Sequence, residues 1–164
     1  MPLPEAVRSI KIAAESSVEV FMLPDLLIET ERLIIITIFN ESSGDKINYA
    51  ILKTGILTKD SITANAFLEN SERYTVIGHI NIDPNTYIEY EVYKQYRNQG
   101  FATEMLNAVK EFCLAYGLQP KLYIDSNNTI SKKTAANSGF SPRNRPGTKS
   151  SGGAKMYEKW EMDK

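Results

Sequence analysis

A strand pattern meets a helix pattern at Arg97-Asn98-Gln99-Gly100-Phe101-Ala102-Thr103. Upstream, Tyr87–Tyr93 alternates and is rich in aromatic and β-branched residues, which favours a strand. Downstream, apolar residues recur at helical spacing as far as Tyr116, and Gly117 is placed to end the helix. Backbone N–H groups converge at a helix N-terminus, where the helix dipole also favours negative charge. The junction therefore predicts a phosphate or pyrophosphate site.

Two motifs resemble one protein family. R-x-x-G-x-A, opening a helix after a strand, is similar to the acyl-CoA-binding signature of the GNAT family of N-acetyltransferases. Tyr96–Glu104 reads like the branch that contains the ribosomal-protein alanine N-acetyltransferases. Asn128-x-x-Ser131, followed by Gly139-Phe140, resembles the second signature of the same family. The two motifs have the family's order, and about one helix and one strand separate them.

Composition describes an ordinary globular chain. The sequence has 164 residues, 42% of them hydrophobic and 24% charged, which predicts one domain over residues 1–164. Residues 1–25 can be an N-terminal extension, and charges within Met1–Ser16 do not suit a signal peptide. The longest apolar run, Leu33–Phe39, suits a buried strand rather than a membrane span. One cysteine excludes a disulfide framework, and together these features favour the cytoplasm.

Charge is unevenly distributed along the chain. Residues 1–93 hold 14 acidic and 7 basic residues, whereas residues 94–164 hold 6 acidic and 12 basic ones. A polyanionic cofactor would suit the basic part and a cationic amine the acidic part, although surface charges can also drift into this arrangement. No dense basic stripe suggests nucleic acid, and no segment suggests a membrane. The expected partners are acetyl-CoA and an amine substrate, with the protein a monomer or homodimer.

Further elements follow from local patterns. Glu5–Ser16 is ambiguous and could form a short amphipathic helix, and Thr58–Phe67 fits a helix or a strand equally well. Asn128–Ser138 predicts a short helix with Asn128 or Thr129 as its N-cap, and Ser141–Gly153 predicts a loop. The predicted strands are Leu26–Phe39, Ile47–Thr54, Tyr74–Ile82, Lys121–Asp125 and Ala154–Met162.

This order of elements predicts an α/β layer fold with a mixed, mainly antiparallel sheet. The resemblance implies the GNAT fold, in which two central strands splay apart to leave a V-shaped gap. The family usually places two helices after its first strand, whereas Asn40–Thr58 reads as a hairpin here. This departure falls in the part of the fold that faces the acceptor substrate.

The resemblance also implies a set of cofactor-binding residues. Main-chain amides of the turn from Arg97 to Ala102 would hold the pyrophosphate of acetyl-CoA. The N–H of Val92 would face the thioester carbonyl, and Asn128 would contact the pantetheine arm. Phe101 could cover the cofactor or pack in the core. The full set is Val92, Arg97, Asn98, Gln99, Gly100, Phe101, Ala102, Thr103 and Asn128.

Catalytic candidates are three. Acetyl transfer to an amine needs a neutral amine, and alternation places Glu89 and Glu91 on one strand face, where a carboxylate could deprotonate or attract it. By resemblance, Ser131 would return a proton to the departing thiolate. Some relatives place a tyrosine donor on the same short helix, at the position of Ala135. Substitutes for that donor are Tyr123 and Tyr157, and Asp125 is a further candidate at a strand end.

These features predict an acetyl-CoA-dependent N-acetyltransferase acting on a small amine or a protein N-terminus through direct attack in a ternary complex. The alternative is a non-catalytic acyl-CoA-binding or regulatory module of the same fold. Cys113 on a helix interior disfavours a covalent acetyl-enzyme, and His79 in mid-strand is expected to be structural. A single cysteine and a single histidine lack the spacing of a metal site.

Overall fold

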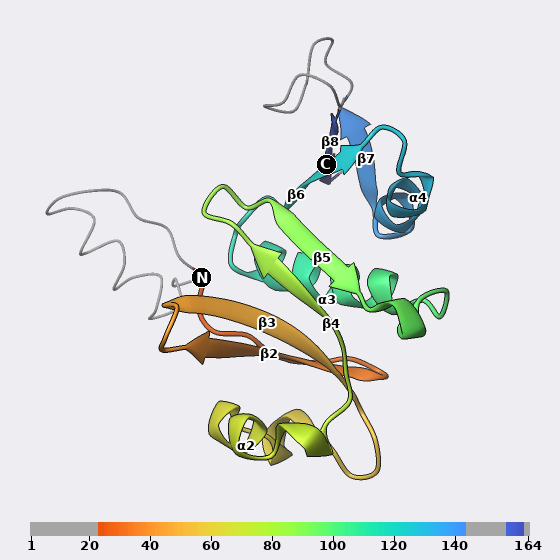
Figure 1. Cartoon of the computed structure of the whole chain (residues 1–164). Coiled ribbons are helices and arrows are strands. Elements are labelled where there is room, and N and C mark those ends of the chain that lie inside the picture. The colour runs from red at the N-terminus through yellow and green to blue at the C-terminus, as the bar shows by residue number, and fades with distance from the viewer. Residues whose placement is uncertain (1–22, 144–156, 163–164) are drawn as a thin grey trace, which may run out of the picture.

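A computed structural model describes residues 23–143 and 157–162 (Figure 1). Five antiparallel strands form the first sheet in the order β1-β2-β3-β4-β5, and three form the second in the order β6-β8-β7. The strands of the first sheet are β1 (Leu27–Glu29), β2 (Leu33–Asn40), β3 (Asp45–Leu52), β4 (Val76–Ile82) and β5 (Ile88–Val92). Those of the second are β6 (Lys121–Asp125), β7 (Phe140–Arg143) and β8 (Tyr157–Met162).

The two sheets meet at one corner. Tyr87, just before β5, forms an isolated parallel bridge with Lys121 at the start of β6, and beyond it β5 and β6 diverge. Figure 1 shows the second sheet turning away from the first above this corner. The described part of the chain therefore has the expected mixed, mainly antiparallel arrangement with a V-shaped gap.

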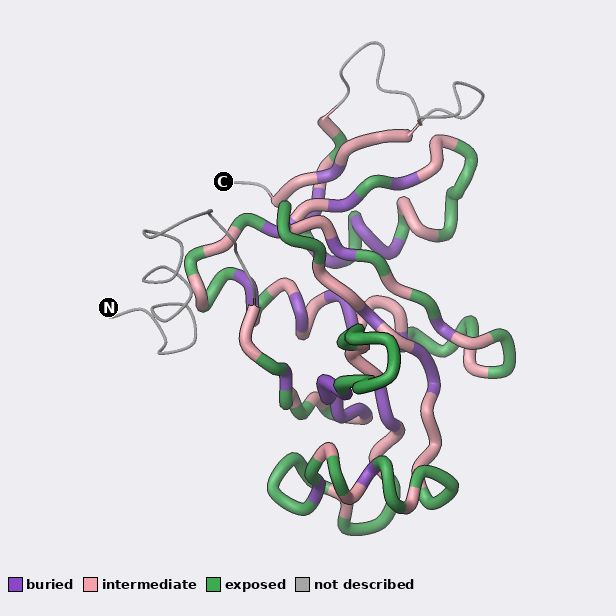
Figure 2. The backbone as a smooth tube through the Cα atoms, turned by 60° about the vertical axis from the view of Figure 1, so that its left-hand side comes forward, coloured by how far each residue is buried: buried purple, intermediate pink, exposed green. Residues whose placement is uncertain are grey.

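Both faces of the first sheet are covered. Helix α3 (Phe101–Ala115) packs on one face, and the short helix α2 (Ala64–Glu69) lies against the other (Figure 1). Strand β2 accordingly buries residues on both sides: Leu33 and Ile35 join the α3 core, whereas Ile34, Ile36 and Ile38 join the α2 core. Figure 2 shows buried residues along the strands and along α3. This double burial explains the continuous apolar run of β2.

Helix α4 (Thr129–Asn137) completes the described fold beside β6 and β7. The Asn128 side chain accepts a hydrogen bond from the Ser131 N–H at 3.0 Å, which confirms Asn128 as its N-cap. The helix ends near Gly139, whose φ of +87° is one that glycine adopts without strain.

Two sequence expectations need correction, and the structure decides a third that was left open. Leu26–Phe39 is not one strand, because the chain turns at Thr30–Arg32 and β1 pairs antiparallel with β2. Thr58–Phe67, left open between helix and strand, forms a 3₁₀ turn at Lys59–Ser61 and enters α2. Residues 141–143 form the end of β7 rather than a loop, since they pair with β8.

Other expectations are confirmed or fall outside the described residues. The hairpin after the first long strand is present as β2 and β3, in place of two helices. The expected helix at Glu5–Ser16, the loop from residue 144 onward and the start of the last strand at residues 154–156 lie outside the described ranges. None of the helices within the described ranges is both long enough and apolar enough to cross a membrane.

Candidate active site

The turn before α3 presents a row of backbone amides. Asn98 and Gly100 both have positive φ, of 63° and 81°, and this reverses the chain directly into the helix. The first intrahelical hydrogen bond runs from the Glu104 N–H to the Gly100 carbonyl at 3.1 Å. The N–H groups of Phe101, Ala102 and Thr103 therefore have no acceptor within the helix, as at any helix N-terminus. Such a site suits an anion.

Val92 lies at the open edge of β5. Tyr93 donates its N–H to Ile77 in β4 at 2.8 Å, whereas the Val92 carbonyl faces away from β4 and accepts a hydrogen bond from Arg97 Nε at 2.9 Å. Along an antiparallel strand, the N–H and C=O of one residue point to the same edge. The Val92 N–H therefore points toward the gap between β5 and β6. Arg97 fixes the turn to the strand end, so it is more than a surface charge.

A pocket of about 480 Å³ joins these groups. Strand β5 contributes Glu91 and Val92 to its lining. The turn and the start of α3 contribute residues Arg97 to Thr103, except Gln99. Helix α4 and its N-cap contribute Ser131 and Asn128. The structure thus brings together most of the residues expected to bind a cofactor. Gln99 is the exception, because it contributes its carbonyl to Arg32 instead. We refer to this cavity as the cofactor-side pocket.

A network that sequence reasoning missed braces the same turn. Glu104 accepts hydrogen bonds from the Thr30 hydroxyl at 2.5 Å, from the Arg32 N–H at 2.9 Å and from Arg32 Nε at 2.7 Å. The Arg32 guanidinium also donates to the Gln99 carbonyl at 2.9 Å and lies 4.2 Å from the Phe101 ring centre. Burial acts to raise the pKa of Glu104, but the hydrogen bonds from Thr30 and Arg32 lower it overall. The β1–β2 turn therefore locks the start of α3.

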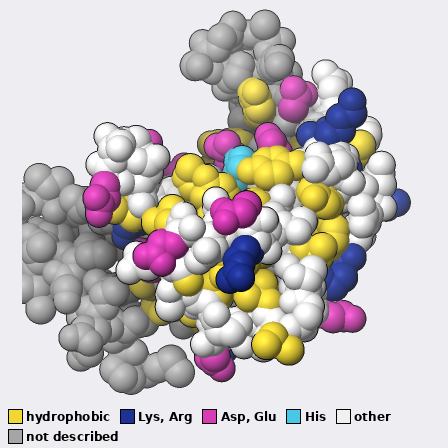
Figure 3. Space-filling view, turned by 60° about the horizontal axis from the view of Figure 1, so that its bottom comes forward, with side chains coloured by type: hydrophobic (Ala, Val, Ile, Leu, Met, Phe, Trp, Pro, Cys, Tyr) yellow, Lys and Arg dark blue, Asp and Glu magenta, His cyan; other side chains and the backbone are white. Residues whose placement is uncertain are grey.

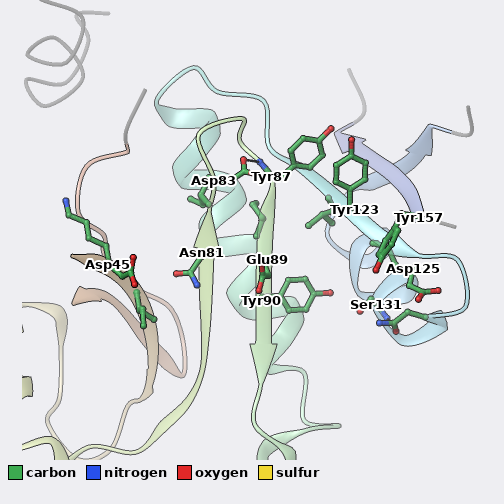
Figure 4. A pocket seen from close by; sticks show the side chains of 17 residues that line it. Asp45, Asn81, Asp83, Tyr87, Glu89, Tyr90, Tyr123, Asp125, Ser131 and Tyr157 are labelled. Carbon is green, nitrogen blue, oxygen red and sulfur yellow. Dashed lines mark hydrogen bonds between the residues drawn. The ribbon is translucent and has the colours of Figure 1, made fainter. Parts of the chain in front are cut away.

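A second, larger cavity lies toward the opposite end of β5. It measures about 730 Å³ and lies between the end of β4, β5, β6 and β8 (Figure 4). Its carboxylates are Asp45, Asp83, Glu89 and Asp125. Glu89 therefore faces this cavity, whereas Glu91 lines the cofactor-side pocket. We refer to the larger cavity as the acidic pocket.

The two pockets share Tyr90, Asn128 and Ser131. In Figure 4 the Tyr90 side chain extends from β5 toward Ser131. Its hydroxyl is buried and forms no hydrogen bond with the described residues. Burial raises the pKa of Tyr90, and the nearby hydroxyls of Ser131 and Thr134 oppose this shift. Tyr90 was missed in the sequence, although its place between Glu89 and Glu91 on the strand before the signature was a usable signal.

The proposed substitutes for a helix tyrosine are less well placed. Ala135 is fully buried in the core, so α4 carries no donor there. Tyr123 is 52% exposed and stacks on Tyr87 with ring centres 4.2 Å apart. Tyr157 and Asp125 line the acidic pocket but not the cofactor-side pocket.

The remaining reactive side chains have structural surroundings. Cys113 is fully buried in α3, and burial raises the pKa of its thiol to about 11. His79 packs edge-on against Tyr93 with ring centres 6.1 Å apart. Within residues 23–143 and 157–162, no group of three His, Cys, Asp or Glu side chains could hold a metal ion. On the face shown in Figure 3, acidic and hydrophobic side chains are interspersed, and the basic ones form no continuous stripe.

Sequence comparison identifies the family. The sequence model described as "Acetyltransferase (GNAT) family" matches residues 37–140, which is more than half of the chain. The chain belongs to the GNAT family. Family membership makes it an acetyltransferase by descent, with acetyl-CoA as the implied acetyl donor. No curated protein matches the sequence closely enough to add a substrate.

Solved structures share this GNAT fold. RimL, a ribosomal L7/L12 alpha-N-protein acetyltransferase, aligns with a TM-score of 0.54 and 13% identity over 87% of this chain and 98% of that one. A GNAT-family acetyltransferase from Bacillus anthracis aligns with a TM-score of 0.52 and 16% identity over 83% of this chain and 96% of that one. At these identities the likeness is one of fold. The microcin C7 self immunity acetyltransferase MccE was solved with acetyl-CoA and AMP. It aligns with a TM-score of 0.48 and 16% identity, and the match covers 70% of this chain and 58% of that one.

Proposed function

We propose that this GNAT protein transfers the acetyl group of acetyl-CoA to a primary amine, on a small molecule or a protein N-terminus, by direct attack in a ternary complex. The observation that carries this proposal is the junction of two pockets at Tyr90, Asn128 and Ser131. One pocket offers an anion site at a helix N-terminus, and the other is lined by carboxylates. We further propose that residues 1–164 form one catalytic domain, with residues 1–25 as an extension.

The cofactor would lie along the cofactor-side pocket. Amides from Asn98 to Thr103 would receive the pyrophosphate, with Arg97 beside it. Asn128 would contact the pantetheine arm, which places the thioester near the open edge of β5. There the Val92 N–H would donate to the carbonyl oxygen as negative charge develops on it. Phe101 is buried and stacked under Arg32, so its main contribution is packing.

The acceptor would enter from the acidic pocket. An ammonium group cannot attack, so a proton must leave it first, directly or through water. Glu89 lines the acceptor side and is the better placed carboxylate for this step; Glu91, on the cofactor side, remains the second candidate. The lone pair of the neutral amine would then attack the thioester carbon, and the nitrogen of the tetrahedral intermediate would lose its extra proton to water. Collapse of the intermediate would cleave the C–S bond and leave an amide and a CoA thiolate.

The thiolate needs a proton as it departs. Ser131 lines both pockets, and the Tyr90 hydroxyl is buried beside it without a hydrogen-bond partner among the described residues. A raised pKa keeps Tyr90 protonated through the neutral range, so its proton is available. We assign Ser131 and Tyr90 together as the proton donors. This pair would compensate for the missing tyrosine at Ala135.

Gly100→Glu tests the cofactor site. Gly100 has φ of +81°, and an added side chain would start 3.4 Å from Arg32 and bring a negative charge to the phosphate site. We expect calorimetry to detect saturable acetyl-CoA binding by the wild type and none by this variant. Gly55→Glu is the matched control, since Gly55 has a similar φ of +61° in open space. Equal acetyl-CoA affinity in all three proteins would refute the assignment.

The fully buried Ala135 favours one alternative, a module that binds acyl-CoA without turnover. Release of free CoA in the presence of amines, followed with a thiol reagent, distinguishes an active acetyltransferase from such a binding module. Tight acetyl-CoA binding with no acetylated product from any amine in a broad panel would establish the binding module instead.

A further inference from the structure

We propose that the acidic pocket selects a primary amine that carries a second positive charge about 10 Å from the reacting nitrogen. This inference rests on the proposed function and narrows its acceptor. It starts from the lining of the pocket, where four carboxylates, Asp45, Asp83, Glu89 and Asp125, accompany a single basic side chain, Lys46. Figure 4 shows these carboxylates on both sides of the opening, from the first sheet and from the second.

The pocket keeps its negative charge. Lys46 directs its Nζ to Asp25, outside the pocket lining, at 2.9 Å. In the described part of the chain, none of the four carboxylates forms an ion pair, whereas Glu29, Glu104, Glu158 and Glu161 all do. Unpaired carboxylates around one cavity attract a cation and exclude an anionic acceptor.

Two of these carboxylates are held in place by main-chain amides. Asp83 Oδ1 accepts hydrogen bonds from the N–H groups of Asn85 and Tyr87, at 2.8 and 2.9 Å. Asp125 Oδ1 accepts one from the Asn127 N–H at 2.9 Å. In both cases Oδ2 makes no hydrogen bond among the described residues, so it is available to a ligand. A preorganised carboxylate loses less entropy when a cation binds.

Position along β5 sets the length of the acceptor. The reacting amine must reach the inner end, where Tyr90 and Ser131 border the cofactor-side pocket. Asp83 is bonded to the Tyr87 amide, three residues back from Tyr90. Three strand residues span about 10 Å. The stacked rings of Tyr87 and Tyr123, 4.2 Å apart, form a flat wall at this outer end.

The chemistry requires two nitrogens in different states. The nitrogen that attacks must be neutral, whereas a second ammonium or a guanidinium keeps its charge and can bind Asp83 at the outer end. Asp125 lies beside Ser131 at the inner end (Figure 4), so it faces the reacting nitrogen instead. An uncharged substituent of equal length would leave Asp83 unpaired. The recognised feature is common to a free alkyl polyamine and to an N-terminus followed by a basic residue.

Paired substrates test the proposal. We expect kcat/KM for spermidine and 1,7-diaminoheptane to exceed that for heptylamine by about tenfold or more, an advantage that shrinks as salt rises. Short peptides with lysine or glutamine at the second position form the second arm and distinguish a peptide acceptor from a free polyamine. Equal kcat/KM for charged and uncharged members of both pairs would overturn the inference while leaving acetyl transfer intact.

Single substitutions test where the second charge of the acceptor binds. Asp83→Asn keeps an oxygen acceptor for the main-chain amides and should lower kcat/KM for the charged acceptor about three- to fivefold. Heptylamine acetylation should change less than twofold. Glu72→Gln, on an exposed 3₁₀ turn outside both pockets, is the charge-matched control.

Spermidine binding tests the inference independently of turnover. Calorimetry with CoA-saturated protein should show spermidine binding that weakens in the Asp83→Asn variant. Unchanged spermidine affinity, or no affinity in the wild type, would overturn the inference. Absence of acetyl-CoA binding by the wild type would instead refute the proposed function itself.

Discussion

Tyr90 connects the two halves of the site at the scale of a single residue. Its ring belongs to the packing around the α3 core, and its hydroxyl is buried beside Ser131 and Thr134. A buried hydroxyl without a partner costs free energy, of order 1–3 kcal/mol. Such a cost is reasonable where a substrate or a water completes the hydrogen bonding.

Removing this hydroxyl should slow catalysis and spare binding. We expect Tyr90→Phe and Ser131→Ala each to lower kcat about tenfold, and the double variant about a hundredfold, with acetyl-CoA affinity unchanged. Because the pKa of Tyr90 is raised, its loss of a proton should not limit kcat below about pH 10. Steady-state kinetics from pH 6 to 10 would check both points.

Tyr116→Phe is the control, since Tyr116 ends α3 and packs against Phe112. If Tyr90→Phe keeps full kcat while Ser131→Ala loses it, Ser131 is the sole donor. If both variants keep it, neither side chain protonates the thiolate.

Strand and helix packing explains how the turn before α3 is held. Thr30 and Arg32 belong to the turn between β1 and β2, and both bind Glu104 in the first turn of α3. Glu104 is 16% exposed, so the pair is screened less than a surface pair. The turn that would receive the cofactor is thus braced by a segment about 70 residues earlier in the sequence.

Breaking this brace should cost stability in a pH-dependent manner. We expect Glu104→Gln to lower the free energy of unfolding by about 1–2 kcal/mol at pH 7 and to weaken acetyl-CoA binding. The folded-state pKa of Glu104 is lowered, so its stabilisation is present above the unfolded value near 4.5 and is lost as pH falls through the lower folded value. Urea unfolding at pH 7 and pH 3 measures the difference.

Asp25→Asn provides the comparison, because its ion pair with Lys46 is 67% and 42% exposed. It should change stability by less than about 0.5 kcal/mol. An equal loss in the two variants, or a Glu104→Gln loss that persists at pH 3, would contradict the role of the brace.

At the scale of the whole fold, the described residues form two sheets that meet at one parallel bridge and diverge around a gap. Acetyl-CoA would contact residues from β5, from α3 and from α4, and so connect elements on both sides. At a ligand concentration 100 times Kd, binding adds about 2.7 kcal/mol to the free energy of unfolding. For a chain of this size that corresponds to a rise in Tm of about 5–10 °C.

Thermal unfolding with and without acetyl-CoA would test this coupling. The Gly100→Glu variant should show no rise in Tm, and Gly55→Glu should show the full one. A rise of equal size in both variants would mean that the ligand binds elsewhere.

Local patterns were sufficient for much of the fold. Alternation along Tyr87–Tyr93, the glycine before α3 and the cap at Asn128 each depend on neighbours a few residues away. They predicted β5, α3 and α4 correctly. Most of the residues expected to bind the cofactor line one pocket for the same reason, since nearly all of them belong to one turn and its adjoining elements.

Contacts between distant segments could not be read in this way. The division of Leu26–Phe39 into two strands follows from the Thr30–Arg32 turn, which Glu104 holds from across the molecule. Likewise, Tyr90 gains its position only where β5 and α4 approach each other. The sequence by itself determined the turn, the caps and the family, because these depend on local backbone preferences. Only the tertiary structure decided which carboxylates line the acidic pocket and which hydroxyls border both pockets, because packing between distant segments sets those positions.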